Sequence, residues 1–356
     1  MIRWTAGFLG VPLALLFPVV AQAQADDQTR EIQERDRRYY QQQAAQQQVA
    51  PVEGDPEAEK VRRALIREAD SIIRDSNYSG KVGKYYKVQT DDPRLSPAAS
   101  VQLLEAFRAH FQDFWEEQLP LTPYEQTSRV YLFYSYFKYN RLLTGKARFE
   151  EFRTVGHYRT SFDVVVVHTD SVPGGLADVL VHEAAHQLTA QQLFAEVHGL
   201  VSPWLSEGLA SYFGFTFQGP DGTFQSGVIG GKSVALFPRA KRRQAGTGWE
   251  RLQKFRKGWK KDEVWPLGEF LGSDPASFYR ESVEDHYAAS WLLVHYLLHG
   301  DGERHRSRFV RFLQQARQGE ADSEALYRTL GMSGTELARE FTDHVRGLKP
   351  GLRKSR

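Results

Sequence analysis

The chain of 356 residues carries 46 Lys and Arg against 44 Asp and Glu, and its formal net charge at pH 7 is +2. This balance gives no general case for nucleic-acid binding, because proteins that bind nucleic acid usually carry a clear excess of positive charge. The chain has no cysteine, which excludes disulfides and a lipid-bearing cysteine. The length allows one large domain or two smaller ones with ample core.

Residues 1–25 have the pattern of a secretory signal peptide. A positively charged start precedes the mostly apolar run Trp4–Val20, and Ala-x-Ala cleavage sequences end at Ala23 and Ala25. An uncleaved membrane anchor is the alternative, but the run is short for a span and contains two prolines. We therefore expect export to the periplasm or the extracellular space.

Residues 26–55 predict a linker rather than a folded unit. This stretch is polar, rich in glutamine and low in complexity, so it cannot bury a core and is expected to be disordered or transiently helical. Pro51–Asp55 marks the expected boundary of one domain over residues 56–349. The tail at 350–356 is basic and expected to fray.

The first half of this domain predicts alternating helices and strands. Apolar spacing indicates helices over Pro56–Arg74 and Pro97–Gln118. Strands are expected at Tyr85–Thr90, Val130–Phe133 and Phe162–His168, and four consecutive valines in the last indicate burial on both of its faces.

The apolar segment Val179–Leu188 contains His182-Glu183-x-x-His186. Residues four apart lie on the same side of an α-helix, so both imidazoles can face one metal ion while Glu183 reaches a metal-bound water. Zinc that performs hydrolysis needs a third protein ligand and an open position. Such a pattern also arises by chance in on the order of one in a hundred chains of this length. Burying these polar groups without a partner would, however, be costly.

A second helix is expected to supply the third ligand. Ser202 and Pro203 are good signals for a helix start, and Glu207 falls within its first two turns. His168 and His198 are expected to be structural or uninvolved rather than ligands.

Together, His182-Glu183-x-x-His186-Gln187 and Trp204-Leu205-x-Glu207-Gly208-x-Ala210-Ser211-Tyr212 resemble the gluzincin metallopeptidases, which include thermolysin and aminopeptidase N. The chain looks most like the bacterial peptidase MA-like domains. The resemblance is specific over Val164–Phe213 and looser from Tyr85 to the C-terminal helices. It implies one zinc per chain on His182, His186 and Glu207, with Glu183 as general base.

The expected fold is α+β and zincin-like, with a small mixed sheet packed on the HExxH helix and a mostly helical C-terminal lobe. In the resembling enzymes an extended peptide pairs with the edge of this sheet. The sequence leaves open whether that edge is Phe162–His168 or Val130–Phe133.

Two departures from the family pattern affect the expected site. Many gluzincins have an acidic residue one turn after the glutamate ligand that orients a ligand histidine, and Ser211 stands there in this chain. A hydroxyl accepts from an imidazole less strongly than a carboxylate, so metal affinity could be lower. The Gly-x-Met-Glu-Asn motif of the aminopeptidases is absent, which argues against that subgroup.

The segment Gly214–Gly231 is rich in glycine and indicates a hairpin or loop, and the basic segment Arg239–Lys261 follows it. The basic segment holds ten Lys or Arg residues and one acid, Glu250. Its simplest interpretation is a solvated helix face, and its alternative is contact with an anionic partner such as an acidic substrate segment or the envelope surface. Its aromatic residues Trp249, Phe255 and Trp259 indicate that it is anchored.

The apolar helix Asp285–His299 contains Tyr287, and a Tyr-Ala-x-Ser-Trp helix at this place resembles that of the peptidase MA-like domains. The resemblance makes Tyr287 a candidate donor to the developing oxyanion. The alternative is that Tyr287 continues the core stripe of this helix. Three further amphipathic helices are expected at Arg308–Arg317, Ala321–Leu330 and Gly334–Leu348.

The predicted function is hydrolysis of a peptide or protein substrate outside the cytoplasm, through a zinc-bound water activated by Glu183. Two alternatives stand beside it. One is a non-catalytic binding or scaffold protein of the cell envelope that zinc stabilises. The other is a zinc hydrolase acting on a non-peptide amide, because the same water chemistry serves both substrates.

Overall fold

The computed structural model describes residues 56–74, 78–144, 155–160, 163–171, 175–197, 201–215, 217–218, 223–229, 248–259, 263–279 and 282–349. The expected signal peptide, linker and basic tail, and most of the N-terminal half of the basic segment, lie outside these residues. Among the described helices, none combines the length and the apolar character needed to cross a membrane.

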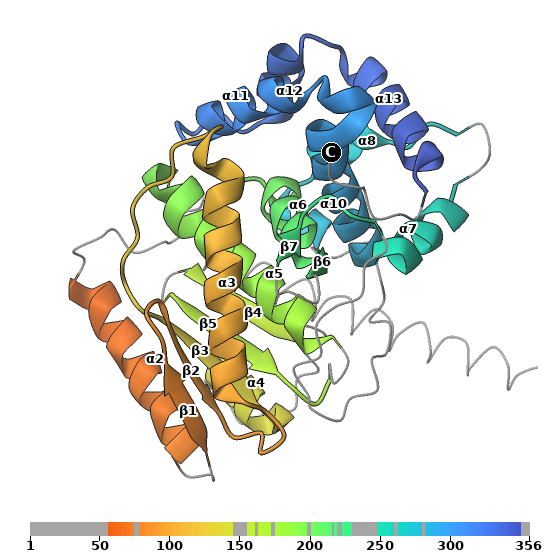
Figure 1. Ribbon diagram of the computed structural model, residues 1–356. Coiled ribbons are helices and arrows are strands. Elements are labelled where there is room, and N and C mark those ends of the chain that lie inside the picture. The colour runs from red at the N-terminus through yellow and green to blue at the C-terminus, as the bar shows by residue number, and fades with distance from the viewer. Residues whose placement is uncertain are drawn as a thin grey trace, which may run out of the picture.

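Within the described chain, five strands form one mixed sheet in the order β1-β2-β3-β5-β4 (Figure 1). The three inner strands run parallel, and the two outer strands are each antiparallel to their neighbour. The strands are β1 (Ser79–Val82), β2 (Tyr86–Thr90), β3 (Ser128–Phe133), β4 (Gly156–Arg159) and β5 (Val164–His168). Together with the many helices, this mixed sheet confirms the α+β class.

The valines of β5 are buried on both faces of the sheet, as predicted. Val165 and Val167 belong to the main core, whereas Val164 and Val166 belong to a second, smaller core. Parallel strands covered on both sides read as continuous apolar runs rather than as alternating ones.

Helices cover each face of the sheet. One face carries α3 (Pro97–Glu116) and α5 (Leu176–Leu188), and the other carries α2 (Pro56–Arg74) and α4 (Tyr136–Thr144) (Figure 1). Ser96 begins α3 by accepting a hydrogen bond from the Ala99 amide, and a proline fills the first helical position. A π-helical turn (Thr189–Leu193) and a 3₁₀ turn (Ala195–Val197) follow α5.

Helices dominate the rest of the chain. The buried pair α6 (Pro203–Gly214) and α10 (Val283–His299) pack closely against each other, and α6 also packs on α5. The remaining elements are β6 (Phe217–Gln218), β7 (Phe224–Gln225), α7 (Gly248–Lys257), α8 (Leu267–Leu271), α9 (Pro275–Phe278), a 3₁₀ turn (Gly300–Glu303), α11 (Arg306–Ala316), α12 (Ser323–Leu330) and α13 (Gly334–Gly347). The last three helices, α11, α12 and α13, confirm the three amphipathic helices predicted near the C-terminus.

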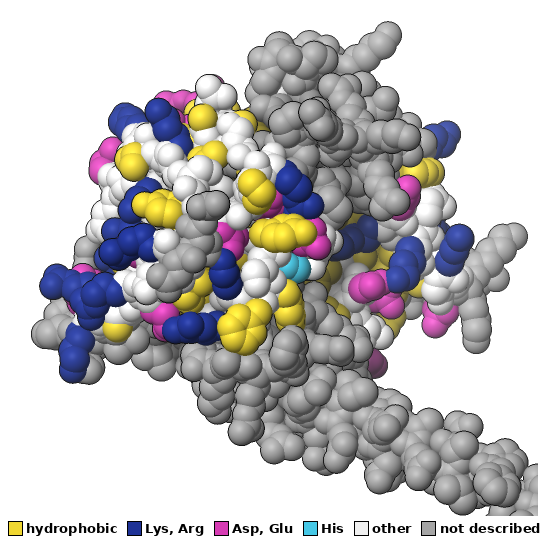
Figure 2. All heavy atoms as spheres, turned by 90° about the horizontal axis from the view of Figure 1, so that it is seen from below, with side chains coloured by type: hydrophobic (Ala, Val, Ile, Leu, Met, Phe, Trp, Pro, Cys, Tyr) yellow, Lys and Arg dark blue, Asp and Glu magenta, His cyan; other side chains and the backbone are white. Residues whose placement is uncertain are grey.

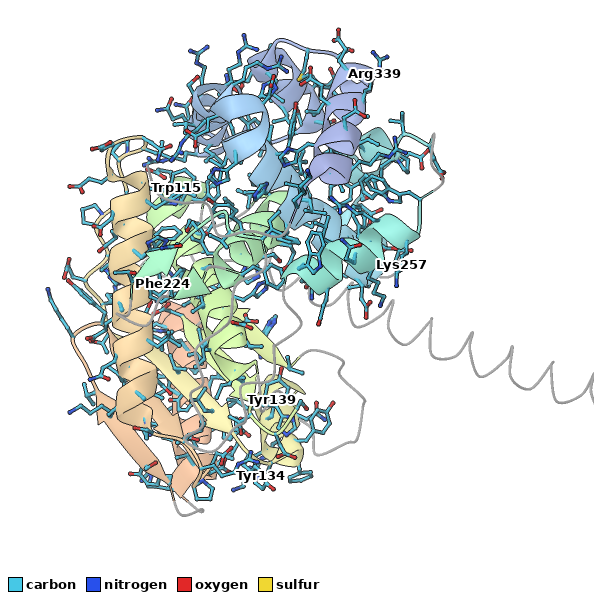
Figure 3. The ribbon with its side chains drawn as sticks, turned by 45° about the vertical axis from the view of Figure 1, so that its right-hand side comes forward. Trp115, Tyr134, Tyr139, Phe224, Lys257 and Arg339 are labelled. Atoms are coloured by element: carbon cyan, nitrogen blue, oxygen red, sulfur yellow. The ribbon has the colours of Figure 1, made fainter. Side chains whose placement is uncertain are left out.

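The sheet and the helical part of the molecule meet at α5, which packs on β4 and β5 and also on α6. In Figure 3, Tyr134 and Tyr139 lie at the lower end of the molecule, whereas Arg339 lies at the top of the helical part and Lys257 at its right-hand side. Phe224 of the small β6–β7 hairpin lies against α3, where its ring packs on Phe107. The hairpin confirms the expectation for Gly214–Gly231 in its described residues.

Candidate metal centre

The HExxH helix α5 is buried nearly all round, as its sequence predicts. Its apolar residues pack into the main core, and among them Leu180, Ala184 and Leu188 are fully buried. The side chains of His182 and His186 keep 20% and 16% of their surface exposed. The two imidazoles therefore stay accessible from a helix that is otherwise held in the interior.

Helix α6 brings Glu207 to the two histidines. Two glycines permit the close packing this requires, because a Cβ at Gly208 would lie 2.7 Å from the Ser290 carbonyl oxygen of α10. A Cβ at Gly214 would lie 3.1 Å from the Cβ of His182. Ser202 precedes α6 as predicted, but its buried hydroxyl makes no hydrogen bond to the described residues.

Three side-chain atoms converge at one point. His182 Nε2 and His186 Nε2 are 3.2 Å apart, and Glu207 Oε2 lies 3.5 Å from the first and 3.3 Å from the second. Zinc binds such atoms at about 2.0–2.2 Å, which places two ligands of a tetrahedral ion roughly 3.3–3.6 Å apart. The triangle therefore fits a single zinc ion with a fourth position open.

The two oxygens of Glu207 have different partners. Oε1 accepts hydrogen bonds from Tyr279 Oη at 2.9 Å and from Tyr287 Oη at 3.0 Å. Oε2 is buried and makes no hydrogen bond within the described chain, and it faces the histidines. Burial alone would raise the pKa of Glu207, but His186 and His182 outweigh it and hold that pKa well below the usual range. An orphaned, ionised oxygen at this point is what a metal cation would satisfy.

The Tyr287 ring stacks on His182, with 6.4 Å between the ring centroids. Its hydroxyl is directed at Glu207 rather than at an open position. Tyr279, which makes the equivalent hydrogen bond, was not predicted. It follows the short helix α9, where neither spacing nor flanking motif marks it as part of a site.

The side chain of Glu183, which α5 carries, is buried against the edge strand β4. Its Oε2 accepts a hydrogen bond of 2.8 Å from the Tyr158 amide. A Cβ at Gly156 would lie 2.8 Å from the other carboxylate oxygen, so this glycine makes the room that Glu183 occupies. Burial raises the pKa of Glu183, and the neighbouring histidines partly oppose that rise.

The hydroxyl beside the candidate ligand His186 belongs to Ser206, not to Ser211. Ser206 Oγ is 3.2 Å from His186 Nδ1. The buried hydroxyl of Ser211 has no hydrogen-bond partner among the described residues. The structure therefore differs from the expectation for Ser211, because Ser206, the residue before Glu207, is the one that lies beside His186.

Gln187, the residue after the second histidine, ties α5 to the sheet. Its side-chain oxygen accepts from Tyr86 Oη at 3.0 Å, and its amide nitrogen donates to Ser128 and to Asp163. All four side chains are buried, and Asp163 also accepts a hydrogen bond from the Tyr124 hydroxyl. A satisfied buried network of this kind fixes helix position.

The edge strand beside the site is β4, and neither candidate from the sequence occupies that place. β5 lies between β3 and β4, and β3 lies between β2 and β5. Both are therefore internal. The sequence of β4, Gly-His-Tyr-Arg, has no apolar alternation, and this is why its strand was not predicted.

His168 forms hydrogen bonds at a distance from the metal centre, to Ser171 Oγ at 2.6 Å and the Tyr134 carbonyl at 3.0 Å. The prediction for His198 lies outside the described residues. Figure 2 shows one face of the molecule, on which a histidine side chain reaches the surface beside acidic side chains.

A family model described as "Protein of unknown function (DUF1570)" matches residues 177–320. The matched stretch includes the three candidate ligands, Glu183 and Tyr287. No curated protein matches the chain.

Proposed function

We propose that the protein is a zinc-dependent metallopeptidase of the gluzincin type, with a zincin-like fold, acting outside the cytoplasm. One observation carries the proposal: His182, His186 and Glu207 place their ligand atoms 3.2–3.5 Å apart, beside a buried carboxylate that is not part of the triangle. A structural zinc site has no need of that fourth group.

Glu183 is the proposed general base. Zinc held by the three ligands would supply Lewis-acid chemistry, polarising a carbonyl and lowering the pKa of water to about 7. Glu183 would accept the proton of the attacking water and return it to the leaving amine. Its burial and raised pKa suit a group that must both take and give a proton.

Tyr287 is the proposed donor to the developing oxyanion. Glu207 Oε1 has two tyrosine donors, so Tyr287 could turn to a substrate carbonyl while Tyr279 keeps that oxygen satisfied. Strand β4 supports a peptide substrate, because an edge strand beside Glu183 offers backbone groups with which an extended peptide can pair.

The test is to assay the purified protein on a panel of proteins and peptidoglycan, with and without a chelator. Cleavage of peptide bonds that stops with chelator and returns with zinc is the expected result. His186→Ala and Glu207→Ala should lose both the activity and the zinc measured by elemental analysis. Full zinc content in both variants, or chelator-resistant cleavage, would contradict the proposal. Zinc-dependent release from peptidoglycan alone would favour the amide hydrolase.

A further inference from the structure

Arg251 of α7 is a cationic side chain near the metal centre. Arg251 is half-buried on α7, and it forms neither a hydrogen bond nor an ion pair with any described residue. Its guanidinium lies over the Phe215 ring at 5.1 Å. That contact uses none of the five N–H donors of the guanidinium in a hydrogen bond to a described residue.

Two other basic residues of the same helix do have partners for their charged groups. Lys254 pairs with Glu284, and Arg256 donates to backbone carbonyls at the end of α13, including that of Val345. Their roles are to hold α7 to its neighbours. Nothing comparable accounts for Arg251.

The register of α7 against α10 places Arg251 at the level of Tyr287. The two helices run antiparallel: a Cβ at Gly248 would lie 2.7 Å from the Trp291 ring, and Lys254 pairs with Glu284 six residues further along α7. Arg251 is midway between these two contacts. The residue midway between Trp291 and Glu284 on α10 is Tyr287 or its neighbour.

A second set of contacts places Arg251 at the same point of the molecule. Phe215, on which the guanidinium lies, directly follows Gly214, and Gly214 packs against His182. Tyr287 stacks on the same histidine. Arg251 therefore lies on the His182 side of the metal centre, close enough to Tyr287 and Glu207 to interact electrostatically with both.

Among the described residues around the site, the positive charge of Arg251 is not balanced by a carboxylate of its own. The two negative charges of Glu207 and Glu183 would balance the charge of a zinc ion, and Glu284 is already paired with Lys254. Burial lowers the pKa of Arg251, which reflects the cost of holding its charge away from water. An anion beside the guanidinium would offset that cost.

We propose that Arg251 binds a carboxylate of the substrate, either an acidic side chain close to the cleaved bond or a free C-terminus. The guanidinium fork matches a carboxylate with two parallel hydrogen bonds, which makes arginine the usual residue for this task. The inference rests on the proposed function and narrows its substrate class to peptides with an anionic group near the cut.

The test uses metal-anchored probes, since the natural substrate is not needed to measure the preference. Three hydroxamates share one linker, which is either malonyl or succinyl in all three. They differ in the residue attached to it: glutamine amide, glutamate α-amide, or glutamine with a free C-terminus. The first has no carboxylate, the second has one in the side chain, and the third has one at the C-terminus. Dissociation constants for the zinc-loaded protein are measured by calorimetry.

We expect at least one acidic probe to bind about tenfold tighter than the neutral probe, the usual worth of a charge-assisted hydrogen bond. Arg251→Gln should abolish the preference, and Arg251→Lys should keep part of it. Lys257→Gln is the matched control, because it removes an exposed charge from the same helix (Figure 3), and it should leave the preference intact. Thermal unfolding of each variant checks that it is folded.

Equal binding of all three probes by the wild type, or an unchanged preference in Arg251→Gln, would overturn the role of Arg251 and leave the metallopeptidase proposal standing. Hydroxamates that bind equally well after zinc is removed would overturn the metal centre itself, and this inference with it. The probe that carries the preference identifies which carboxylate is recognised.

Discussion

Glu183 follows a candidate ligand in the sequence, yet its carboxylate contacts a different part of the molecule. The Tyr158 amide donates to it, so the side chain is held by β4 and is not a member of the ligand triangle. Substitution at this residue can therefore separate catalysis from metal binding.

Glu183→Gln keeps the size of the side chain and an oxygen that can accept from the Tyr158 amide. We expect the variant to fold, to retain its zinc and to lose at least about 10²–10⁴-fold in activity, which is the usual worth of a positioned general base. Glu105→Gln is the control, because Glu105 also accepts from a backbone amide, that of Tyr85. Wild-type turnover by Glu183→Gln would exclude it as the base.

Tyr279 and Tyr287, which both donate to Glu207, allow metal binding and catalysis to be compared in two matched variants. Each donates to the same oxygen, so Tyr279→Phe and Tyr287→Phe should each weaken zinc binding by about 10–100-fold in a chelator competition. At saturating zinc, only Tyr287→Phe should lower kcat, by about 10²-fold, because only Tyr287 is proposed to reach the oxyanion. Equal kcat values for the two variants would reduce Tyr287 to an orienting role.

Among the elements, α5 and α6 were predictable, and β4 was not. His182, His186 and Glu207 follow from helical spacing and a helix-start signal, which are local properties of the chain. The placement of β4 depends on pairing with β5, a non-local contact that its short polar sequence does not encode. Ser206 and Tyr279 escaped prediction for a related reason, since their roles depend on how α6, α9 and α10 meet.

The contact between α6 and α10 carries a prediction at this scale. Ala at Gly208 would gain about 1 kcal/mol of helix propensity, but its Cβ would press on the Ser290 carbonyl, a backbone atom that cannot move aside. Overpacking of this kind costs about 1–3 kcal/mol, so we expect Gly208→Ala to lower the free energy of unfolding in denaturant titrations.

Gly347→Ala is the matched control for this helix contact. Gly347 ends α13, and a Cβ there would meet nothing within 4 Å. Its free energy of unfolding should stay the same or rise. A stabilised Gly208→Ala variant would show that α6 and α10 can separate at little cost.

At the scale of the whole molecule, the candidate ligands come from two helices that belong to different layers. α5 packs on the sheet, while α6 packs between α5 and α10. With no cysteine to cross-link the chain, a bound metal would be a strong link between these layers.

Removing the metal should therefore lower the thermal stability of the protein. A ligand present at about 1,000 times its Kd adds roughly 4 kcal/mol to the free energy of unfolding, which corresponds to a fall in Tm of about 7 °C for a domain of this size. Scanning calorimetry with and without chelator measures it. Glu207→Ala should show no such fall, and an equal fall in that variant would mean that chelator acts elsewhere.

The shortness of β4 has a consequence for how a peptidase built this way would choose its targets. A strand of four residues spans roughly 13 Å, so it could align only about four residues of a bound chain. The Tyr158 amide belongs to the same strand and also holds Glu183, so the base and the aligned peptide would share one frame of reference. Pairing over so few residues would position the cleaved bond accurately but would contact few substrate side chains. It suits the trimming of many unrelated exposed segments better than the recognition of one long motif.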